Sequence, residues 1–381
     1  MAKNKNKEKK PNPVSAFLWK DKRRRAKNFN FLLMFIIALA AVAMGFIGEK
    51  LEIMDTGDDV VITQPQEDIV FEEEDLQMME AISQAGSLND YLYQWANNGG
   101  ELYSSKNVIN VLLVGLDSKD ALENGGRSDS LILVSLNKKD KKIYMTSFFR
   151  DTWCYMNTAN GMYSKINASY FYGGPTGLID TIEKNFKVDI DYYVAVDFSS
   201  FVDIINALGG LTVEVQEYEA EYINRTTKHT IEHGPAVKLN GAEALVFARI
   251  RKSDADSDVS RTRRQRQVIT SFIESAKGAS ISQLNDALDM LFKYVKTDLT
   301  QMQIISYATQ ALANGWINYD IEQYTLSDEN IFKAGYVGNT SVVFIDFPLA
   351  ANTIQMQVYG DSNVVLDENR IKIFNLVSRF A

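Results

Sequence analysis

The sequence predicts an α/β protein with a mixed central sheet, flanked by helices on both faces and preceded by one transmembrane helix. Short apolar runs typical of strands alternate with segments of helical periodicity from residue 107 onward, and such alternation favours a sheet covered by helices. One run of eighteen uncharged residues lies near the N-terminus. The 381 residues, 46% hydrophobic and 23% charged, suffice for one large domain or two smaller ones.

The uncharged run covers residues 31–48, and with two flanking residues it predicts a transmembrane helix over 29–48. Its length is close to the minimum that crosses the roughly 30 Å hydrocarbon core of a bilayer. Residues 1–28 hold eleven basic residues against two acidic ones, which keeps this tail in the cytoplasm and places the body outside the cell. A cleaved signal peptide is the alternative, because Ala41-Val42-Ala43 resembles a cleavage site.

Residues 49–106 are expected to form an extracytoplasmic stalk, with a predicted helix ending near residue 96, and residues 107–381 to form the body. After residue 28 the chain carries 29 basic and 47 acidic residues, which argues against a nucleic-acid partner. Cys154 is the only cysteine, so no intramolecular disulfide can form. An exported protein of this kind suits a Gram-positive-type bacterium.

The body begins with an apolar strand at residues 108–116, which we expect to be buried on both faces. Further strands are expected at residues 131–136, 143–149 and 192–196. Helical periodicity is found at residues 177–186, 201–208, 242–249, 261–276 and 284–295. The segment from residue 319 mixes short strand and helix signals.

Two carboxylates flank the first two predicted strands. Asp117 follows the first strand, and Gly126-Arg127-Ser128-Asp129 precedes the second. If these strands are neighbours, the carboxylates meet at one edge of the sheet and suit Mg²⁺, which takes water and substrate phosphate oxygens as its other ligands. Alternatively, both aspartates are turn residues beside glycines.

Three more charged clusters follow: Arg150-Asp151-Thr152 after the third strand, Lys165-Ile166-Asn167, and a dense run of arginines over residues 249–266. The planar guanidinium group suits bidentate binding of phosphate. Arg261 and Arg264 are three apart and would share one face of a helix. The alternatives are a structural ion pair, a surface stretch and a solvated basic face, respectively.

Two negative observations narrow the chemistry. His229 and His233 are the only histidines and lie in a polar stretch, which argues against a histidine-based triad or a zinc site. The chain has no Walker-type loop and no G-x-G-x-x-G motif, which argues against nucleotide binding.

Together, the clusters resemble the LytR-CpsA-Psr family over about residues 107–277. The matching pieces, in the family's order, are VLLVGLD (111–117), GRSDSLILVSLN (126–137), RDT (150–152), KINASYFYGGP (165–175), IDYYVAVDFSSFVDIINALGGLTVEV (190–215), LNGAEALVFARIRK (239–252) and DVSRTRRQRQ (258–267). Two positions depart from the family's pattern: Phe149, where Pro is frequent, and Lys119, where Arg is frequent.

The resemblance implies a membrane-anchored phosphotransferase. Such an enzyme takes a glycopolymer, for example a teichoic acid or a capsule polysaccharide, from an undecaprenyl-pyrophosphate carrier in the membrane. It attaches the polymer to a muramic-acid hydroxyl of peptidoglycan through a phosphodiester bond, while an apolar channel between sheet and helices holds the polyprenyl chain. The alternatives are a non-enzymatic membrane-anchored regulator (a transcriptional attenuator), a module that binds polyprenyl phosphate or polysaccharide, and an enzyme of the same class whose acceptor is a protein.

The resemblance also implies roles for individual residues. Asp117 and Asp129 would hold Mg²⁺ or Mn²⁺. The catalytic group would comprise Arg127, Asp129, Arg150 and Asp151. The pyrophosphate would be bound by Lys165, Asn167, Arg249, Arg251, Arg261, Arg264 and Gln265.

Overall fold

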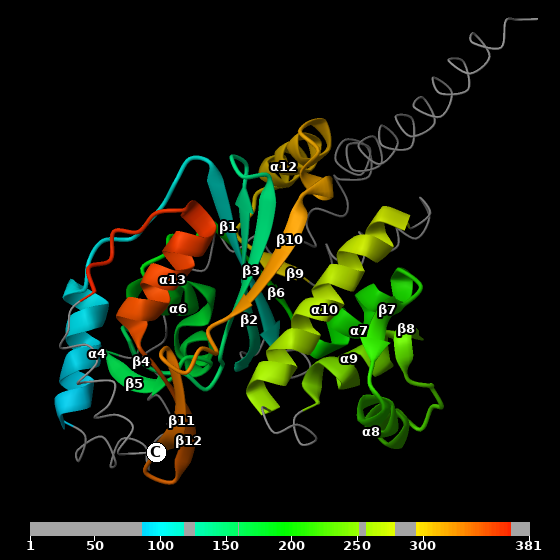
Figure 1. Ribbon diagram of the computed structural model, residues 1–381, viewed down its shortest axis with the longest axis horizontal. Helices are drawn as coiled ribbons and strands as arrows, with labels where there is room; N and C mark the ends of the chain where they lie inside the picture. Colours follow the sequence, from blue (N-terminus) through cyan, green and yellow to red (C-terminus); the bar gives the residue numbers. More distant parts are fainter. Residues whose placement is uncertain (1–85, 118–125, 159, 251–256, 279–294, 367–381) are drawn as a thin grey trace, which may run out of the picture.

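The computed structural model describes residues 86–117, 126–158, 160–250, 257–278 and 295–366 (Figure 1). The expected transmembrane helix at 29–48 and the two positions Lys119 and Arg251 lie outside these ranges, as does nearly all of the helix expected at 284–295. None of the helices within the described ranges has the length and apolarity that a membrane span requires.

A six-stranded mixed sheet forms the centre of the molecule, in the order β10-β3-β2-β1-β6-β9. β1 is antiparallel to β2 and parallel to β6, β2 is antiparallel to β3, β3 is parallel to β10, and β6 is antiparallel to β9. The strands are β1 (Val108–Leu116), β2 (Ser128–Asn137), β3 (Lys142–Phe148), β6 (Tyr192–Val196), β9 (Val295–Thr297) and β10 (Asp320–Thr325). The mixed sheet predicted from the sequence is confirmed.

Helices cover both faces of this sheet, as predicted (Figure 1). On one face lie α4 (Gly86–Asn98), α6 (Ala168–Phe186) and α13 (Phe347–Tyr359), with the hairpins β4 (Trp153–Met156)–β5 (Met162–Lys165) and β11 (Phe332–Val337)–β12 (Thr340–Ile345). On the other lie α7 (Phe198–Ala207), α9 (Gly241–Arg249) and α10 (Ser257–Gly278), with α8 (Glu217–Thr227) and the hairpin β7 (Leu211–Val215)–β8 (Gly234–Leu239). α12 (Gln301–Ala313) and the short helix η3 (Trp316–Asn318) lead into β10.

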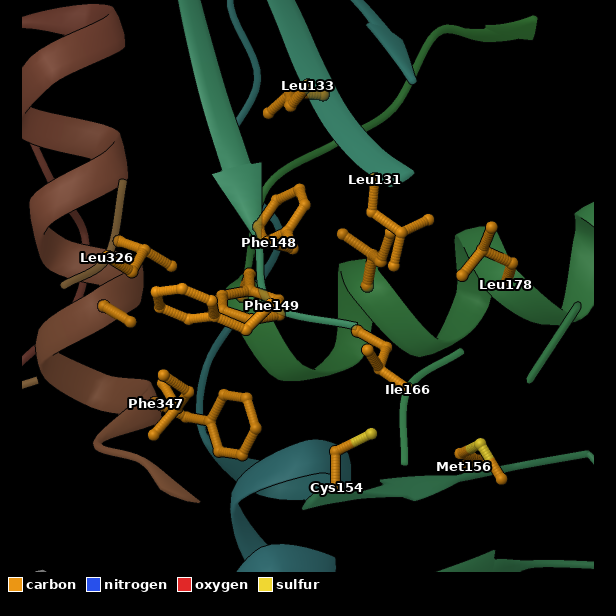
Figure 2. Close-up of a cluster of buried hydrophobic side chains, with 14 of the residues drawn as sticks. Leu131, Leu133, Phe148, Phe149, Cys154, Met156, Ile166, Leu178, Leu326 and Phe347 are labelled. Atoms are coloured by element: carbon orange, nitrogen blue, oxygen red, sulfur yellow. The ribbon is translucent and has the colours of Figure 1, made fainter. Parts of the chain in front are cut away.

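Two separate hydrophobic clusters stabilise the two layers. The first joins the sheet to α4, α6 and α13, and Figure 2 shows part of it, including Phe148, Phe149 and Phe347. The second joins α7, α8, α9, α10 and the β7–β8 hairpin around Phe247 and Val268. The apolar side chains of the second cluster come from these surrounding elements, so this layer has a core of its own.

Only one face of β1 is fully buried, contrary to the expectation that both are. Leu112 and Leu116 are 0% exposed and belong to the first cluster. Leu113 and Gly115, which point to the other face, are only half-buried. The difference arises because the helices of the second layer do not close completely onto this face.

The compact body begins before residue 107, within the segment that we expected to be a stalk. Leu92 and Trp95 of α4 are buried in the first hydrophobic cluster. The indole N–H of Trp95 donates to the carbonyl oxygen of Asn185 at the end of α6, at 2.8 Å. The predicted helix ending near residue 96 is therefore part of the folded domain, because its apolar face packs against α6.

Candidate functional site

Four strand ends meet at one edge of the sheet and bring charged residues together. β1, β3 and β6 end at this edge, whereas β2 begins there because it runs antiparallel to β1 and β3. Asp117 follows β1, Asp129 is the second residue of β2, Arg150 follows β3 and Asp197 follows β6. The expectation that the first two strands are neighbours is confirmed, and it places Asp117 and Asp129 at the same edge.

A cavity of about 470 Å³ opens beside these residues, between the half-buried face of the sheet and the helices α7, α9 and α10. Its walls are mostly apolar and include Leu113, Val194, Val196, Phe201, Leu245 and Ile269. Its charged and amide-bearing residues are Asp117, Asp129, Arg150, Asp197, Arg249, Arg261 and Gln265. A large apolar pocket with a few convergent polar groups is typical of a ligand site.

An alternating series of charges begins at the cavity with Asp129 and Arg150, which line it, and continues to Asp151 and Lys165, which are not among its lining residues. Arg150 forms an ion pair with Asp129, and its Nε lies 3.4 Å from Oδ2 of Asp151. Lys165 continues the series, with its Nζ 3.4 Å from Oδ1 of Asp151. These four side chains are between 13% and 20% exposed, so they are shielded from water more than surface pairs are and hold one another in place.

Arg127 and Asn167 connect the backbone around this series. The amide of Asp117 donates to the carbonyl oxygen of Arg127, whose own amide donates to Oδ1 of Asp117, each at 3.1 Å. Asn167 donates its backbone N–H to the carbonyl oxygen of Arg150 at 3.1 Å, and its carbonyl accepts from Ser128 at 3.2 Å. Neither side chain lines the cavity; both residues tie the strand ends together.

Three residues from the second layer complete the polar part of the cavity. Arg249 is exposed at the end of α9, where its guanidinium stacks 4.2 Å from the ring centroid of Phe198, a contact that orients the group without neutralising it. Arg261 lines the cavity from α10 and is 3% exposed. Gln265 accepts a hydrogen bond from the Ser130 hydroxyl at 3.1 Å, so it links α10 to β2.

Arg264 is not brought to the cavity. Its side chain is 0% exposed, and its Nη1 donates to Oε1 of Glu219 in α8 at 3.0 Å. Its Nη2 donates to the carbonyl oxygen of Ile250 at 2.7 Å. Residues three apart on a helix are offset by about 60°, and this offset turns Arg264 towards α8 while Arg261 faces the cavity.

Arg266 occupies a third direction around the same helix. Its Nη1 donates to the Ser147 hydroxyl of β3 at 2.7 Å. Burial, together with repulsion from Arg263, lowers the pKa of Arg266 to about 10, so the group stays charged at neutral pH and fastens α10 to the sheet.

Sequence reasoning missed Asp197 and Phe198. Asp197 caps α7, because its Oδ1 accepts from the backbone N–H of Ser200 at 2.9 Å and from the Ser200 hydroxyl at 2.6 Å. A detectable signal was present, since Asp197 follows an apolar strand just as Asp117 does. The carboxyl ends of neighbouring parallel strands meet at the same edge, which places both aspartates at the cavity.

Comparisons of this chain with protein families, with known sequences and with solved structures agree with one another. The model of the LytR_cpsA_psr family matches residues 73–354. The polyisoprenyl-teichoic acid–peptidoglycan teichoic acid transferase TagU of Bacillus licheniformis is 38% identical over 193 residues, which are 50% of this chain and 60% of that protein. The chain therefore spans less than two thirds of the length of this relative.

Two further matches cover larger shares of their proteins. TagU of Oceanobacillus iheyensis is 34% identical over 250 residues, 61% of this chain and 75% of that protein. Among solved structures, TagT bound to LI-WTA is similar with a TM-score of 0.54 at 25% identity, over 68% of this chain and 93% of that one. The α/β architecture with a mixed sheet is thus shared with solved relatives.

Proposed function

This chain belongs to the LytR_cpsA_psr family, and from that premise we propose that it transfers a teichoic-acid-type glycopolymer from a polyisoprenyl-pyrophosphate carrier to peptidoglycan. The observation that carries the proposal is the cavity, whose apolar walls run directly into a cluster of arginines and carboxylates. Such a site suits a ligand with a hydrocarbon chain at one end and a pyrophosphate at the other.

Each part of the site has a role in this proposal. The apolar walls accept part of the polyisoprenyl chain, which is favourable because it removes apolar surface from water. Arg150, Arg249 and Arg261 bind the pyrophosphate oxygens, since guanidinium groups form strong charge-assisted bonds to phosphate. Asp129 and Asp151 flank the Arg150 guanidinium and so fix where it meets the phosphate.

The transfer itself exchanges one phosphorus–oxygen bond for another. A hydroxyl group of peptidoglycan attacks the phosphorus next to the glycopolymer, and the bond from this phosphorus to the bridging oxygen breaks. Polyisoprenyl phosphate leaves with that oxygen, and a carboxylate at the cavity takes up the hydroxyl proton. The arginines stabilise the negative charge that develops on the transferred and leaving phosphates.

Asp117 and Asp129 would hold Mg²⁺ or Mn²⁺. The residues fit such an ion: Mg²⁺ in phosphate-handling sites commonly uses one or two carboxylates and completes its shell with water and phosphate. Both aspartates line the same cavity, at the edge of the sheet where β1 ends and β2 begins. When bound, the ion supplies positive charge to the reacting phosphate.

We also propose that residues 29–48 anchor the chain in the cell membrane, with the N-terminus in the cytoplasm and the body outside. This arrangement keeps the cavity on the side of the membrane where peptidoglycan lies. A lipid-linked donor would then meet the cavity by diffusion within the bilayer.

The proposal is tested with the full chain in detergent, a polyisoprenyl-pyrophosphate-linked teichoic acid as donor, peptidoglycan fragments as acceptor and Mg²⁺. Mass spectrometry should detect the phosphodiester-linked product. Asp129→Ala and Arg150→Ala should abolish its formation because they remove a cavity residue each. Arg263→Ala is the matched control, since this arginine is 42% exposed on the same helix as Arg261 and does not line the cavity.

The other outcomes separate the alternatives. Donor binding by the wild-type chain without product would indicate a binding module. A chain that neither binds nor transfers the donor would favour the regulator. Full activity of the Asp129→Ala or Arg150→Ala variant would overturn the assigned site.

A further inference from the structure

The turn after β3 carries charged residues of the site and an apolar anchor on opposite sides. Thr152 closes the turn, since its backbone N–H (3.1 Å) and its hydroxyl (2.6 Å) both donate to the carbonyl oxygen of Phe149. Arg150 faces the cavity, whereas Phe149 is 1% exposed and belongs to the first hydrophobic cluster (Figure 2). The placement of Phe149 in the core and that of Arg150 at the site are therefore set by the same short turn.

The β11–β12 hairpin contacts this turn on both sides of Arg150. Before it, the ring of Phe332 in β11 packs against the ring of Phe149, with 4.9 Å between centroids and 41° between planes. After it, the backbone N–H of Val343 in β12 donates to the carbonyl oxygen of Asp151 at 2.8 Å. Val343 is 3% exposed, so water does not compete easily for this bond.

The two contacts differ in what holds them. The Val343 bond is a backbone bond, extended by a parallel bridge between Val343 and Thr152, and it survives most changes of side chain. The contact between Phe149 and Phe332 consists of ring packing alone and therefore depends on both aromatic side chains. A substitution of Phe149 therefore removes the ring contact between hairpin and turn and leaves the backbone bond in place.

We propose that Phe149 is a positioning residue for Arg150 and that the β11–β12 hairpin is the support against which it is held. The inference rests on the proposed function for the part that Arg150 takes in transfer. Arg150 must present its guanidinium to phosphate while it contacts Asp129 and Asp151. A shift of about 1 Å in such a group can lower a rate about 100-fold, so a turn that is loose on its core side would impair transfer.

The test compares the full-length wild type with Phe149→Ala, Phe149→Leu and Phe332→Ala in detergent. Ile354→Ala is the control, because Ile354 of α13 is 0% exposed in the same cluster but belongs to neither the turn nor the hairpin. The first readout is the arginine Nε–H signal of Arg150 in nitrogen-15 spectra, assigned by its loss in Arg150→Lys. The second is kcat and donor KM for transfer.

Phe149→Ala and Phe332→Ala should shift or broaden the Arg150 signal and lower kcat by about tenfold or more. Phe149→Leu should restore most of both, because it keeps an apolar side chain of similar reach. Ile354→Ala should lower Tm and leave the Arg150 signal and kcat nearly unchanged. If Phe149→Ala proves too unstable to fold, Phe332→Ala and Phe149→Leu carry the comparison.

An unchanged Arg150 signal in Phe149→Ala and Phe332→Ala would overturn the positioning role, whatever the activity. Equal losses of signal and kcat in Ile354→Ala would overturn it too, because they would reduce the effect to general destabilisation. If the wild-type chain lacks transfer activity while Phe149→Ala and Phe332→Ala still change the Arg150 signal as expected, the proposed function is refuted. The positioning of Arg150 by Phe149 would still stand.

Discussion

Arg264 and Arg263 are neighbours in sequence that share the carboxylate of Glu219 in different surroundings. Arg264 is 0% exposed and lies 3.0 Å from Oε1 of Glu219, which is itself 1% exposed. Arg263 is 42% exposed and lies 3.4 Å from the same oxygen. Removing one partner of a buried ion pair leaves an uncompensated charge, whereas removing an exposed partner costs little.

Arg264→Ala should therefore lower the free energy of unfolding by about 3–5 kcal/mol. Arg263→Ala should change it by less than about 1 kcal/mol. Chemical denaturation of both variants measures the difference. The double variant Arg264→Met with Glu219→Leu should recover much of the loss, since it removes both buried charges together. Equal effects of the two single alanine variants would contradict this account.

At the level of elements, the contact between α4 and α6 carries a buried ammonium group. Lys187, just after α6, is 3% exposed, donates from Nζ to the carbonyl oxygen of Ala96 at 3.0 Å and lies 5.3 Å from the ring centroid of Trp95. Burial, with repulsion from Lys184 as a smaller cause, lowers the pKa of Lys187 from its ordinary value of 10.5 to about 8.

This pKa predicts a stability that rises with pH. Below pH 8 Lys187 is protonated in both the folded and the unfolded chain. Between about 8 and 10.5 the unfolded chain keeps a proton that the folded chain has lost, so the free energy of unfolding increases through this window by up to about 1.4 kcal/mol per pH unit. Denaturation curves of the wild type and of Lys187→Met, recorded across the window, should diverge; parallel pH dependences would contradict the prediction.

Elements with a single, uninterrupted periodicity were predictable from the sequence. Elements that are interrupted by a break in the backbone, or that are buried by residues distant in sequence, were not. The strands at 108–116 and 192–196 were placed at their observed bounds, because their apolar runs are long and end at polar residues. The helix expected at 177–186 is only the second part of α6, since Gly174, with φ 60°, and Pro175 interrupt its regular backbone. The hairpin β11–β12 acquires its burial from distant residues such as Phe149, which local patterning does not reveal.

At the scale of the whole molecule, the residues of the candidate site were largely predictable from the sequence, whereas the packing that surrounds them was not. Asp117, Asp129, Arg150, Arg249 and Arg261 were predicted from charged clusters, and the structure brings them to one cavity. Arg264 was assigned with them because helical spacing gives a shared face but not the neighbour that the face meets. The cavity itself was expected only as an implied apolar channel, because an interior void between two layers leaves no local mark on sequence.

The void between the two layers makes adjacent positions of β1 respond in opposite ways to enlargement. Leu112 is 0% exposed in the first hydrophobic cluster, whereas Leu113 lines the cavity. Leu112→Trp forces extra volume into a filled core and should cost about 1–3 kcal/mol or more. Leu113→Trp places the added ring in empty space, so the free energy of unfolding should stay equal or increase.

The effects of the two substitutions on donor binding should have the opposite order: Leu113→Trp, which leaves stability intact, should impair it more than Leu112→Trp. The ring of Leu113→Trp occupies space that the proposed polyisoprenyl chain needs, so donor KM should rise about tenfold or more, in keeping with lost apolar contact. Thermal unfolding and transfer kinetics of both variants measure the two effects. A Leu113→Trp chain that is destabilised like Leu112→Trp would mean that the cavity closes in solution. Unchanged donor binding by a stable Leu113→Trp chain would mean that the lipid lies elsewhere, because Leu113 belongs to the apolar wall that the proposed polyisoprenyl chain would contact.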